Sequence, residues 1–372
     1  MTYDCIIIGA GFSGATVAER LAAAGKKVLV VDRRRHVAGN AYDAYDPQSN
    51  ILTHTYGPHY FRTNSDKVRA YLSQFTEWHP VDYKILSFTE GRYWQFPINL
   101  NTFEQLLGRP STSEEMKETL EKWKLPIANP QNSEEAIVSQ VGVELYERFY
   151  KNYTIKQWKR HPRDLDSSVC ARIPIRTNRD DRYLSERFQA LPSGGYTVLI
   201  QKLLSHPNIQ ILLNADFRDI RENVSCRHTV YTGQIDEYYR YQFGPLPYRS
   251  LRFERETHEV EFFQPTMQVN YPNDKDFTRI VEIKHATGQQ SPITTIVKEY
   301  PDDFAVGKEP YYPIPSPDTK ALYSRYAELA AEEKNVTFLG RLATYRYYNM
   351  DQVVAAALEA TDKIIGTLNH AA

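Results

Sequence analysis

The N-terminal stretch carries the pattern that most restricts how this chain can fold. The run YDCIIIGAGFSGATVAERLAAAGKKVLVVD, residues 3–32, predicts a buried strand at Cys5–Ile8, an alanine-rich helix ended by Gly25 and a second buried strand at Val28–Val31. Two apolar strands joined by one helix form a β-α-β unit, whose strands run parallel. The sequence therefore predicts an α/β fold that contains a parallel sheet.

The turn between the first strand and the helix reads Gly9-Ala10-Gly11-Phe12-Ser13-Gly14. Gly9 permits a tight turn, Gly11 lets the backbone approach a pyrophosphate, and Gly14 lets the helix pack closely on the strand. The N–H groups at the start of the helix then face the phosphates. Asp32 closes the second strand, where its carboxylate can accept hydrogen bonds from a ribose. Together these residues predict a dinucleotide-binding site.

The segment after Asp32 bears on the choice between NAD and FAD. The run VDRRRHVAGNAYD, residues 31–43, resembles the continuation found in the flavoprotein superfamily that includes amine oxidases. The strand that ends at Gly340 and the capped helix behind it resemble the second flavin-contacting segment of that superfamily. The resemblance favours FAD as the cofactor. The cofactor contacts expected are Gly9, Gly11, Phe12, Ser13, Gly14, Asp32, Arg33, Gly39, Asn40, Gly340, Arg341 and Met350.

The rest of the chain changes character twice. From about residue 65 to residue 165, charged segments with helical spacing predominate, whereas β-rich runs separated by Pro, Asn and Gly follow residue 250. The tail returns to a strand and a long helix capped by Asn349 and Gln352. We expect a discontinuous Rossmann-like FAD-binding domain with an inserted helical domain and an antiparallel β-sheet domain. The expected ranges are 1–65 with 195–245 and 328–372 for the FAD-binding domain, 66–170 for the helical domain, and 171–194 with 246–327 for the sheet and substrate domain.

Composition limits the partners and the compartment. With 45 Lys+Arg against 46 Asp+Glu, the chain has no global field that would hold it on nucleic acid or an anionic membrane. Cys5, Cys170 and Cys226 are widely spaced and odd in number, which argues against a disulfide framework or a structural zinc site. No apolar run approaches the roughly 20 residues needed to span a bilayer, and no signal-peptide pattern is present. We expect a cytoplasmic protein without a metal site, a nucleic-acid partner or membrane insertion.

Segments spread over nearly the whole chain resemble the UDP-galactopyranose mutase family, and they follow the order of that family. They are YGPHYFRTN (56–64), YTIKQW (153–158), ARIPIRTNRDDRYL (171–184), LPSGGYT (191–197), VNYPNDKDFTR (269–279), YYPIP (311–315) and GRLATYRYYNMDQ (340–352). Members of the family bind FAD and interconvert the six-membered and five-membered ring forms of UDP-galactose without net redox change. The resemblance therefore implies an isomerase that supplies galactofuranose for bacterial surface glycans.

The resemblance also implies a mechanism in which the cofactor is the nucleophile. N5 of reduced FAD attacks the anomeric carbon of the sugar as UDP leaves. The flavin–sugar adduct opens, recloses through the other hydroxyl and is displaced by UDP. An external reductant such as NAD(P)H would keep the flavin reduced. Because family members commonly form homo-oligomers, we expect one here.

A departing diphosphate needs concentrated positive charge, and the fixed fork of arginine donors supplies it at any pH. Family positions assign Arg172 and Arg279 to the two sides of the pyrophosphate and His59 to the neighbourhood of the flavin, and we expect these three residues to be catalytic. The resemblance gives Tyr153 and Trp158 to the uracil. The remaining substrate contacts that it implies are Arg62, Tyr150, Tyr183, Asn270, Tyr312, Arg341, Tyr347 and Asn349.

The segment CARIPIRTNRDDRYL, residues 170–184, is rich in arginine. Arg176, Arg179 and Arg182 alternate with acidic and amide side chains, so we expect most of them to pair with neighbouring carboxylates. Arg172 is the one expected to reach the ligand. Because a UDP-sugar must enter and then be shielded from water, we expect the loop around residues 174–195 to act as a lid that carries Arg172 inward.

Three positions depart from the family pattern. Tyr150 stands where many members have phenylalanine, Ala38 replaces the first glycine of a Gly-Gly-Asn, and the third is Arg62. The usual motif GPHxFHT has two histidines, and here the second is replaced by Arg62. Arginine at this position is associated with relatives that also accept UDP-N-acetylgalactosamine, since a longer donor can reach a C2 acetamide. The alternatives left open are a mutase for UDP-N-acetylgalactosamine or for a dTDP-deoxysugar, an amine-oxidase-like flavin dehydrogenase, and a non-catalytic flavoprotein that only binds UDP-sugars.

Overall fold

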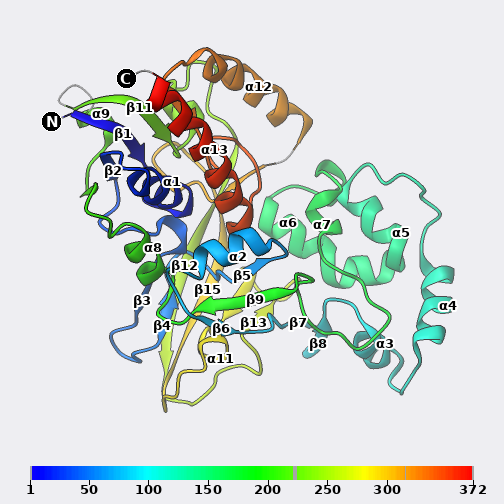
Figure 1. Ribbon diagram of the computed structural model, residues 1–372. Helices are drawn as coiled ribbons and strands as arrows, with labels where there is room; N and C mark the ends of the chain where they lie inside the picture. The colour runs from blue at the N-terminus through cyan, green and yellow to red at the C-terminus, as the bar shows by residue number, and fades with distance from the viewer. Residues whose placement is uncertain (1, 221–223, 315, 371–372) are drawn as a thin grey trace.

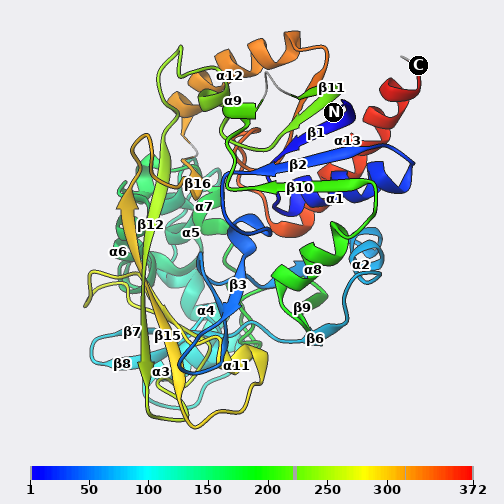
Figure 2. The same ribbon diagram turned by 90° about the vertical axis from the view of Figure 1, so that its left-hand side faces the viewer.

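A parallel sheet of five strands is assembled from segments that are far apart in the sequence (Figure 1, Figure 2). Its strand order is β10-β2-β1-β11-β17, and every neighbouring pair is parallel. The strands are β1 (Thr2–Ile8), β2 (Val28–Asp32), β10 (Ile209–Leu213), β11 (Ser225–Tyr231) and β17 (Val336–Phe338). The discontinuous Rossmann-like fold is therefore confirmed.

The computed structural model describes residues 2–220, 224–314 and 316–370. Met1, residues 221–223, Pro315 and residues 371–372, which the predicted domain ranges include, lie outside the described residues. The division into three domains stays a prediction.

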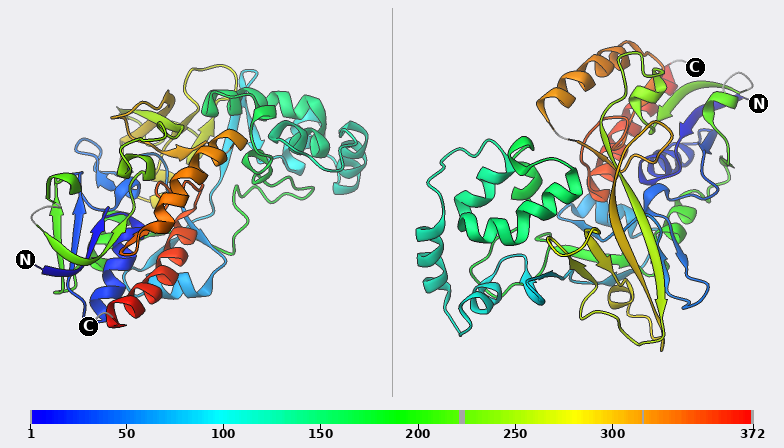
Figure 3. Two further views of the ribbon diagram at one scale, coloured as in Figure 1. Left: turned by 90° about the horizontal axis from the view of Figure 1, so that it is seen from above. Right: turned by 180° about the vertical axis from the view of Figure 1, so that it is seen from behind.

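Helix α1 (Phe12–Ala23) joins β1 to β2 and completes the predicted β-α-β unit. Its alanines Ala15, Ala18 and Ala22 are fully buried, because the sheet and a second helix approach α1 closely. That second helix is α13 (Met350–His370), which lies beside α1 in Figure 3. The backbone N–H of Asn349 donates to Oε1 of Gln352 at 3.0 Å, as expected for the cap of this helix.

The second large sheet has seven strands in the order β16-β12-β15-β14-β13-β7-β8. We expected an antiparallel sheet. Strands β13 and β7 pair in parallel, so the sheet is mixed. Its register sets Asn270 opposite Arg279. The strands are β7 (Ile85–Thr89), β8 (Arg92–Phe96), β12 (Tyr248–His258), β13 (Gln268–Asn270), β14 (Arg279–Val281), β15 (Thr294–Asp303) and β16 (Tyr312–Pro313).

A helical region projects to one side of the molecule (Figure 1). It consists of α3 (Leu100–Leu107), α4 (Ser113–Trp123), α5 (Ser133–Tyr146), η2 (Glu147–Lys151), α6 (Asn152–Trp158), η3 (Pro162–Asp164) and α7 (Ser168–Ala171). The first third of the range expected for the helical domain, 66–170, also supplies the strands β6 (Trp78–Pro80), β7 and β8. In β7, buried residues alternate with half-buried ones, which is the period of a strand. Within the described residues, no helix has the length and apolar character needed to cross a membrane.

Two small sheets and several short elements connect these parts. Strands β3 (Asp43–Tyr45) and β4 (Leu52–His54) form a pair, and β5 (Phe61–Thr63), β9 (Phe188–Pro192) and β6 (Trp78–Pro80) form a sheet in the order β5-β9-β6. Strand β9, which follows the arginine-rich segment, thus pairs outside the seven-stranded sheet. The remaining helices are η1 (Gly39–Ala41), α2 (Asp66–Leu72), α8 (Tyr196–Leu203), α9 (Phe217–Ile220), α10 (Ile235–Tyr238), α11 (Lys284–Thr287) and α12 (Pro317–Glu332).

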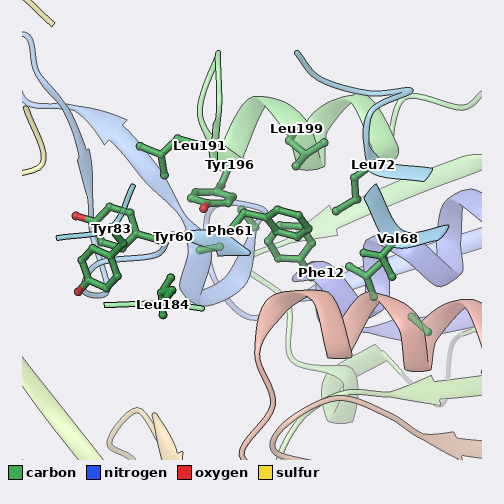
Figure 4. Close-up of a cluster of buried hydrophobic side chains, with 14 of the residues drawn as sticks. Phe12, Tyr60, Phe61, Val68, Leu72, Tyr83, Leu184, Leu191, Tyr196 and Leu199 are labelled. Carbon is green, nitrogen blue, oxygen red and sulfur yellow. The ribbon is translucent and has the colours of Figure 1, made fainter. Parts of the chain in front are cut away.

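The apolar core continues from the parallel sheet towards the segment that carries His59. Figure 4 shows part of it, in which the ring of Phe12 from α1 meets the ring of Tyr196 from α8 edge-on, with centroids 6.0 Å apart. Phe61 of β5 and Leu72 of α2 pack in the same core and are fully buried. This packing fixes the start of α1 relative to β5.

Candidate active site

A cavity of about 640 Å³ opens at the carboxyl ends of β1, β2 and β11, which is where ligands bind in open α/β sheets. Except for Gly14, the residues expected to contact the cofactor all line it. They are Gly9, Gly11, Phe12, Ser13, Asp32, Arg33, Gly39, Asn40, Gly340, Arg341 and Met350. The sequence therefore located this cavity correctly.

The glycines of the cavity wall leave room that a side chain would fill. Gly9 has φ +107°, and a Cβ there would lie 2.1 Å from Oγ1 of Thr232. A Cβ on Gly39 would lie 3.1 Å from the Cα of Gly11. At Gly14 it would lie 1.9 Å from the carbonyl oxygen of Gly9, so Gly14 allows the helix to pack rather than touching the cavity. The wall fits the close approach of a pyrophosphate to the backbone.

Asp32 is held by the backbone and still faces the cavity. Its Oδ2 accepts a hydrogen bond from the N–H of Ala10 and its Oδ1 from the N–H of Arg34, each at 2.8 Å. Each carboxylate oxygen has more than one lone pair, so Asp32 can still accept bonds from ribose hydroxyls. Its fixed orientation fits a dinucleotide ligand.

An ion-pair cluster, Arg33, Arg34 and Glu309, lies at the cavity wall. Glu309, on the connection between β15 and β16, pairs with Arg33 at 2.8 Å and with Arg34 at 2.5 Å. Arg34 also donates to Oδ1 of Asn40 at 2.7 Å. Glu309 itself lines the cavity, so the cluster connects the two large sheets across the place proposed for the cofactor.

His59 lines the same cavity, and its protonation state is set by its surroundings. Burial, with the nearby His54, lowers the pKa of His59 to about 3, so the ring is neutral at pH 7. Nδ1 lies 2.9 Å from the carbonyl oxygen of Gly57, which can only accept, so Nδ1 carries the proton and Nε2 is free to accept. The backbone N–H of His59 donates to Nδ1 of His54 at 3.0 Å.

Beside the cavity lies a group that we call the arginine–tyrosine cluster: Arg62, Arg172, Arg341, Tyr312 and Tyr347. Nη1 of Arg172 donates to the hydroxyl of Tyr347 at 3.0 Å. The rings of Tyr312 and Tyr347 stack with centroids 5.6 Å apart. The guanidinium carbon of Arg341 lies 5.5 Å from each of these two ring centroids, and Arg341 also lines the cavity. Arg341 therefore connects the cluster to the cavity.

The charge around Tyr347 is strongly positive. Burial alone would raise the pKa of this tyrosine, but the guanidinium groups of Arg172, Arg341 and Arg62 outweigh it and lower the pKa. Positive charges that converge on one hydroxyl in this way form a site suited to a multiply charged anion. Trp158 supplies an aromatic wall, with its centroid 6.2 Å from that of Tyr312 and 6.3 Å from that of Tyr347.

Arg279 approaches the same cluster from β14 and is neutralised on one side by Glu299. Its Nε and Nη2 donate to one carboxylate oxygen of Glu299 at 2.9 and 2.6 Å, and Glu299 is 1% exposed. Burial would lower the pKa of Arg279, but Glu299 holds it above its ordinary value. Burial raises the pKa of Tyr153, whereas Arg279 and Arg172 both lower it, so the two arginines act on one tyrosine.

Arg62 is committed to two partners. Its Nε donates to Glu186 at 2.9 Å and its Nη2 to Oδ1 of Asn349 at 2.9 Å. Glu186 belongs to the loop that we expect to act as a lid. Arg62 thus joins that loop to the start of α13.

The other expected substrate residues occupy different surroundings. Asn270 accepts from Nε2 of Gln268 at 2.8 Å and faces Arg279 across the β13–β14 pair. Tyr183 packs edge-on against Tyr83 with centroids 5.3 Å apart. Tyr150 is 2% exposed and packs on Phe96. Its contact with the substrate stays a prediction.

The remaining arginines of the 170–184 segment are paired, as expected. Arg179 pairs with Glu104 at 2.7 Å and Arg182 with Asp180 at 2.8 Å. Arg176 donates to the carbonyl oxygen of Leu184 at 3.3 Å and lies 3.5 Å from Asp180. All three of these guanidinium groups therefore have partners within the protein, whereas Arg172 belongs to the arginine–tyrosine cluster.

Sequence reasoning missed several charged residues of the site. Glu299 was hidden in a β-rich run, although one acid at a buried position of an apolar strand is a signal for a paired charge. Glu309 gave no signal, because its partners Arg33 and Arg34 are distant in the sequence. His54 gave none either, because its partner is the backbone N–H of His59 rather than a side chain. Lys156 was passed over inside the YTIKQW segment, between the two residues expected to hold uracil.

Comparison with known proteins shows which family the chain belongs to. The family model for UDP-galactopyranose mutase matches residues 148–347, and the model for an NAD(P)-binding Rossmann-like domain matches residues 7–75. A probable UDP-galactopyranose mutase of Klebsiella pneumoniae is 39% identical over 98% of this chain and 95% of its own length. The chain belongs to the UDP-galactopyranose mutase family. It is therefore an enzyme of the isomerase class.

Relatives in this family differ in their named sugars. A dTDP-fucopyranose mutase of Escherichia coli is 36% identical over 97% of this chain and 98% of its own length. A UDP-galactopyranose mutase of Mycoplasma pneumoniae is 32% identical over 98% of this chain and 96% of its own length.

Solved structures share the fold at low identity. A crystal structure of reduced UDP-galactopyranose mutase covers 98% of this chain and 96% of its own, with a TM-score of 0.77 and 17% identity. A putrescine oxidase variant covers 98% of this chain and 99% of its own, with a TM-score of 0.61 and 13% identity. The chain thus shares its fold with both of these proteins.

Proposed function

We propose that the protein interconverts UDP-galactopyranose and UDP-galactofuranose, with FAD in its reduced state as the cofactor. The observation that carries the proposal is the position of Arg341. This residue lines the dinucleotide cavity and also lies 5.5 Å from the ring centroids of Tyr312 and Tyr347. A nucleotide sugar held by the arginine–tyrosine cluster would therefore present its sugar towards the cofactor.

The residues that line the cavity fit FAD in the way expected for the flavoprotein superfamily that includes amine oxidases. The glycine wall at Gly9, Gly11 and Gly39 would take the pyrophosphate, and Asp32 a ribose. When bound, reduced FAD supplies a nucleophilic nitrogen for attack on the anomeric carbon, a role for which we assign no side chain. His59, kept neutral and with Nε2 unprotonated, can accept a hydrogen bond beside the cofactor without adding charge.

The arginines would hold the diphosphate while its bond to the sugar breaks and forms again. The electron pair of the C1–O bond leaves with UDP and returns in the product, so the reaction needs no net oxidant or reductant. Arg172, Arg279 and Arg341 stabilise this leaving group by charge-assisted hydrogen bonds. Such bonds favour the separated diphosphate more than the intact substrate, and that difference is what accelerates the reaction.

The remaining cluster residues would position the nucleotide and the sugar. Tyr153 and Trp158 on α6 would hold the uracil, and Asn270 the nucleotide. The phosphates or the sugar would contact the hydroxyl and amide groups of Tyr183, Tyr312, Tyr347 and Asn349.

One assay tests the proposal. The protein is reduced under anaerobic conditions, incubated with UDP-galactose, and the ring isomers are separated. We expect the furanose form from reduced protein, none from oxidised protein, and no consumption of electrons. Reaction of only the oxidised protein, with reduction of its flavin in proportion to product, would instead indicate an amine-oxidase-like dehydrogenase and would contradict the proposal.

A second candidate substrate has its own support. A dTDP-fucopyranose mutase is among the relatives with 36% identity, and Arg62 stands where the family usually has histidine. The same assay with dTDP-fucose and UDP-N-acetylgalactosamine compares the three sugars directly. Arg62→His should shift the preference towards UDP-galactose if this guanidinium recognises the sugar. A cytoplasmic location, NAD(P)H as reductant and a homo-oligomeric state remain part of the proposal.

A further inference from the structure

The ammonium group of Lys156 on α6 is held by the main chain of a distant segment. Nζ donates to the carbonyl oxygens of Tyr271 at 2.6 Å, Lys275 at 2.5 Å and Phe277 at 3.1 Å. An ammonium group has three N–H donors, so these oxygens satisfy it completely. All three carbonyls belong to the connection between β13 and β14. Lys156 therefore ties helix α6 to this hairpin.

The two segments that Lys156 joins carry the two halves of the proposed nucleotide site. Helix α6 carries Tyr153 and Trp158, which we assign to the uracil. The hairpin carries Asn270 and Arg279, which face each other at the ends of β13 and β14. A UDP molecule would contact both helix α6 and the hairpin. Its affinity would be highest when the distance between these two segments matches the length of UDP.

Lys156 is the strongest tie between these segments. A second contact joins them at the start of α6, where Nδ2 of Asn152 donates to Oδ1 of Asn273 at 2.8 Å. That contact is solvent-exposed and involves two neutral amides. The Lys156 bonds are charge-assisted, and those to Tyr271 and Phe277 are part-buried whereas that to Lys275 is exposed. Hydrogen bonds to charged groups contribute more than neutral ones.

We propose that Lys156 is a positioning residue that fixes the uracil-binding helix against the pyrophosphate-binding hairpin. The inference rests on the proposed function, because it assumes a nucleoside diphosphate that reaches both segments. The role requires a compact group with three donors that point to three oxygens. The planar fork of arginine presents its donors differently, so arginine does not replace lysine here.

The test compares the binding of uridine with the binding of UDP by calorimetry. The protein is used as the FAD-loaded full chain at pH 7, below the pKa of about 8 to which burial lowers Lys156. The variants are Lys156→Met, Lys156→Arg and the control Lys151→Met. Lys151 lies in the adjacent turn and pairs only at the surface with Glu147, at 2.9 Å.

We expect Lys156→Met to weaken UDP binding by about tenfold, as for the loss of a hydrogen bond to a charged group. Uridine binding should change much less, because its uracil is expected to contact the helix half, at Tyr153 and Trp158. Lys156→Arg should also lower the ratio of UDP to uridine affinity, and this variant keeps the charge if Lys156→Met does not fold. Lys151→Met should match the wild type, and the KM for UDP-galactose should rise only in the Lys156 variants.

Two results would overturn the inference. The first is an equal loss of uridine and UDP affinity in both Lys156 variants, which would mean a merely structural role. The second is UDP affinity at the wild-type level in either variant. A wild-type protein that binds no UDP would instead overturn the proposed function, and this inference with it.

Discussion

Nη1 of Arg172 donates a hydrogen bond of 3.0 Å to the hydroxyl of Tyr347, and its guanidinium carbon lies 5.2 Å from the ring centroid of the same tyrosine. The bond joins the end of α7, where the arginine-rich segment begins, to the turn that carries Arg341. It holds the guanidinium beside the cluster while the side chain of Tyr347 is still 38% exposed. Because the long side chain of Arg172 is already held in place, it need not reorient before it contacts an incoming diphosphate.

Arg172→Ala should reduce kcat/KM for UDP-galactose sharply while FAD stays bound. Each lost charge-assisted hydrogen bond to the diphosphate costs about 1.5–3 kcal/mol, which corresponds to about ten- to hundredfold. Tyr347→Phe should have a smaller effect, because it removes the bond that orients Arg172 but keeps the charge. Steady-state rates and the flavin absorbance per protein measure both quantities. Near-wild-type turnover in Arg172→Ala would remove this residue from the diphosphate site.

Arg279 and Glu299 must be tested as a pair. Arg279→Ala alone leaves a buried carboxylate without its partner, and breaking a buried ion pair costs about 3–5 kcal/mol of unfolding free energy. The double variant Arg279→Ala with Glu299→Gln should recover much of that stability but none of the activity. Urea unfolding and the mutase assay separate the two effects. Recovery of activity in the double variant would show that Arg279 only neutralises Glu299.

Glu309→Gln should speed the release of FAD. The substitution removes the ion pairs with Arg33 and Arg34 at the cavity wall, and exposed pairs contribute up to about 1 kcal/mol each, so we expect an increase of about two- to tenfold. Flavin fluorescence after dilution follows the release. Salt should reproduce the effect in the wild type.

Lys308→Gln is the matched control, because Lys308 lies on the same connection as Glu309 and pairs with Asp302. Equal release rates in Glu309→Gln and the wild type would contradict the role of the cluster.

Stability should fall below pH 6.5 through two buried histidines. Burial lowers the pKa of His54 from 6.5 to about 4, and that of His59 to about 3. Between pH 6.5 and these values the unfolded chain binds protons that the folded protein does not, so the unfolding free energy decreases as the pH falls. Urea unfolding from pH 7 to pH 5 measures the slope. His54→Gln should make it shallower, and an unchanged slope would show that His54 titrates normally in the folded protein.

The sequence was sufficient for the local parts of this protein. The β-α-β unit, the glycine wall of the cavity and the cap at Asn349 depend on residues that are close in the chain, so their pattern is visible in one dimension. The family resemblance supplied Arg172, Tyr347 and Arg341, which the structure brings together. The pairing of Arg179 and Arg182 also followed from their acidic neighbourhood, although the partner of Arg179 is Glu104 rather than an adjacent residue.

Long-range pairing is what the sequence could not supply. The parallel contact of β7 with β13 and the facing of Arg279 with Glu299 depend on strand register between distant segments. The helical spacing around residues 65–165 masked β7 and β8, because two strands of five residues each are short beside the helices that follow.

The order of strands in the parallel sheet has a consequence for synthesis of the chain. The sheet needs β17 at residues 336–338, and α1 needs α13 at residues 350–370. During translation, β1 and α1 leave the ribosome long before β17 and α13. A premature stop before β17 would leave β11 as an unpaired edge and the alanine face of α1 uncovered, which exposes both to aggregation. Nascent chains of this protein should therefore depend on chaperones until α13 has been made.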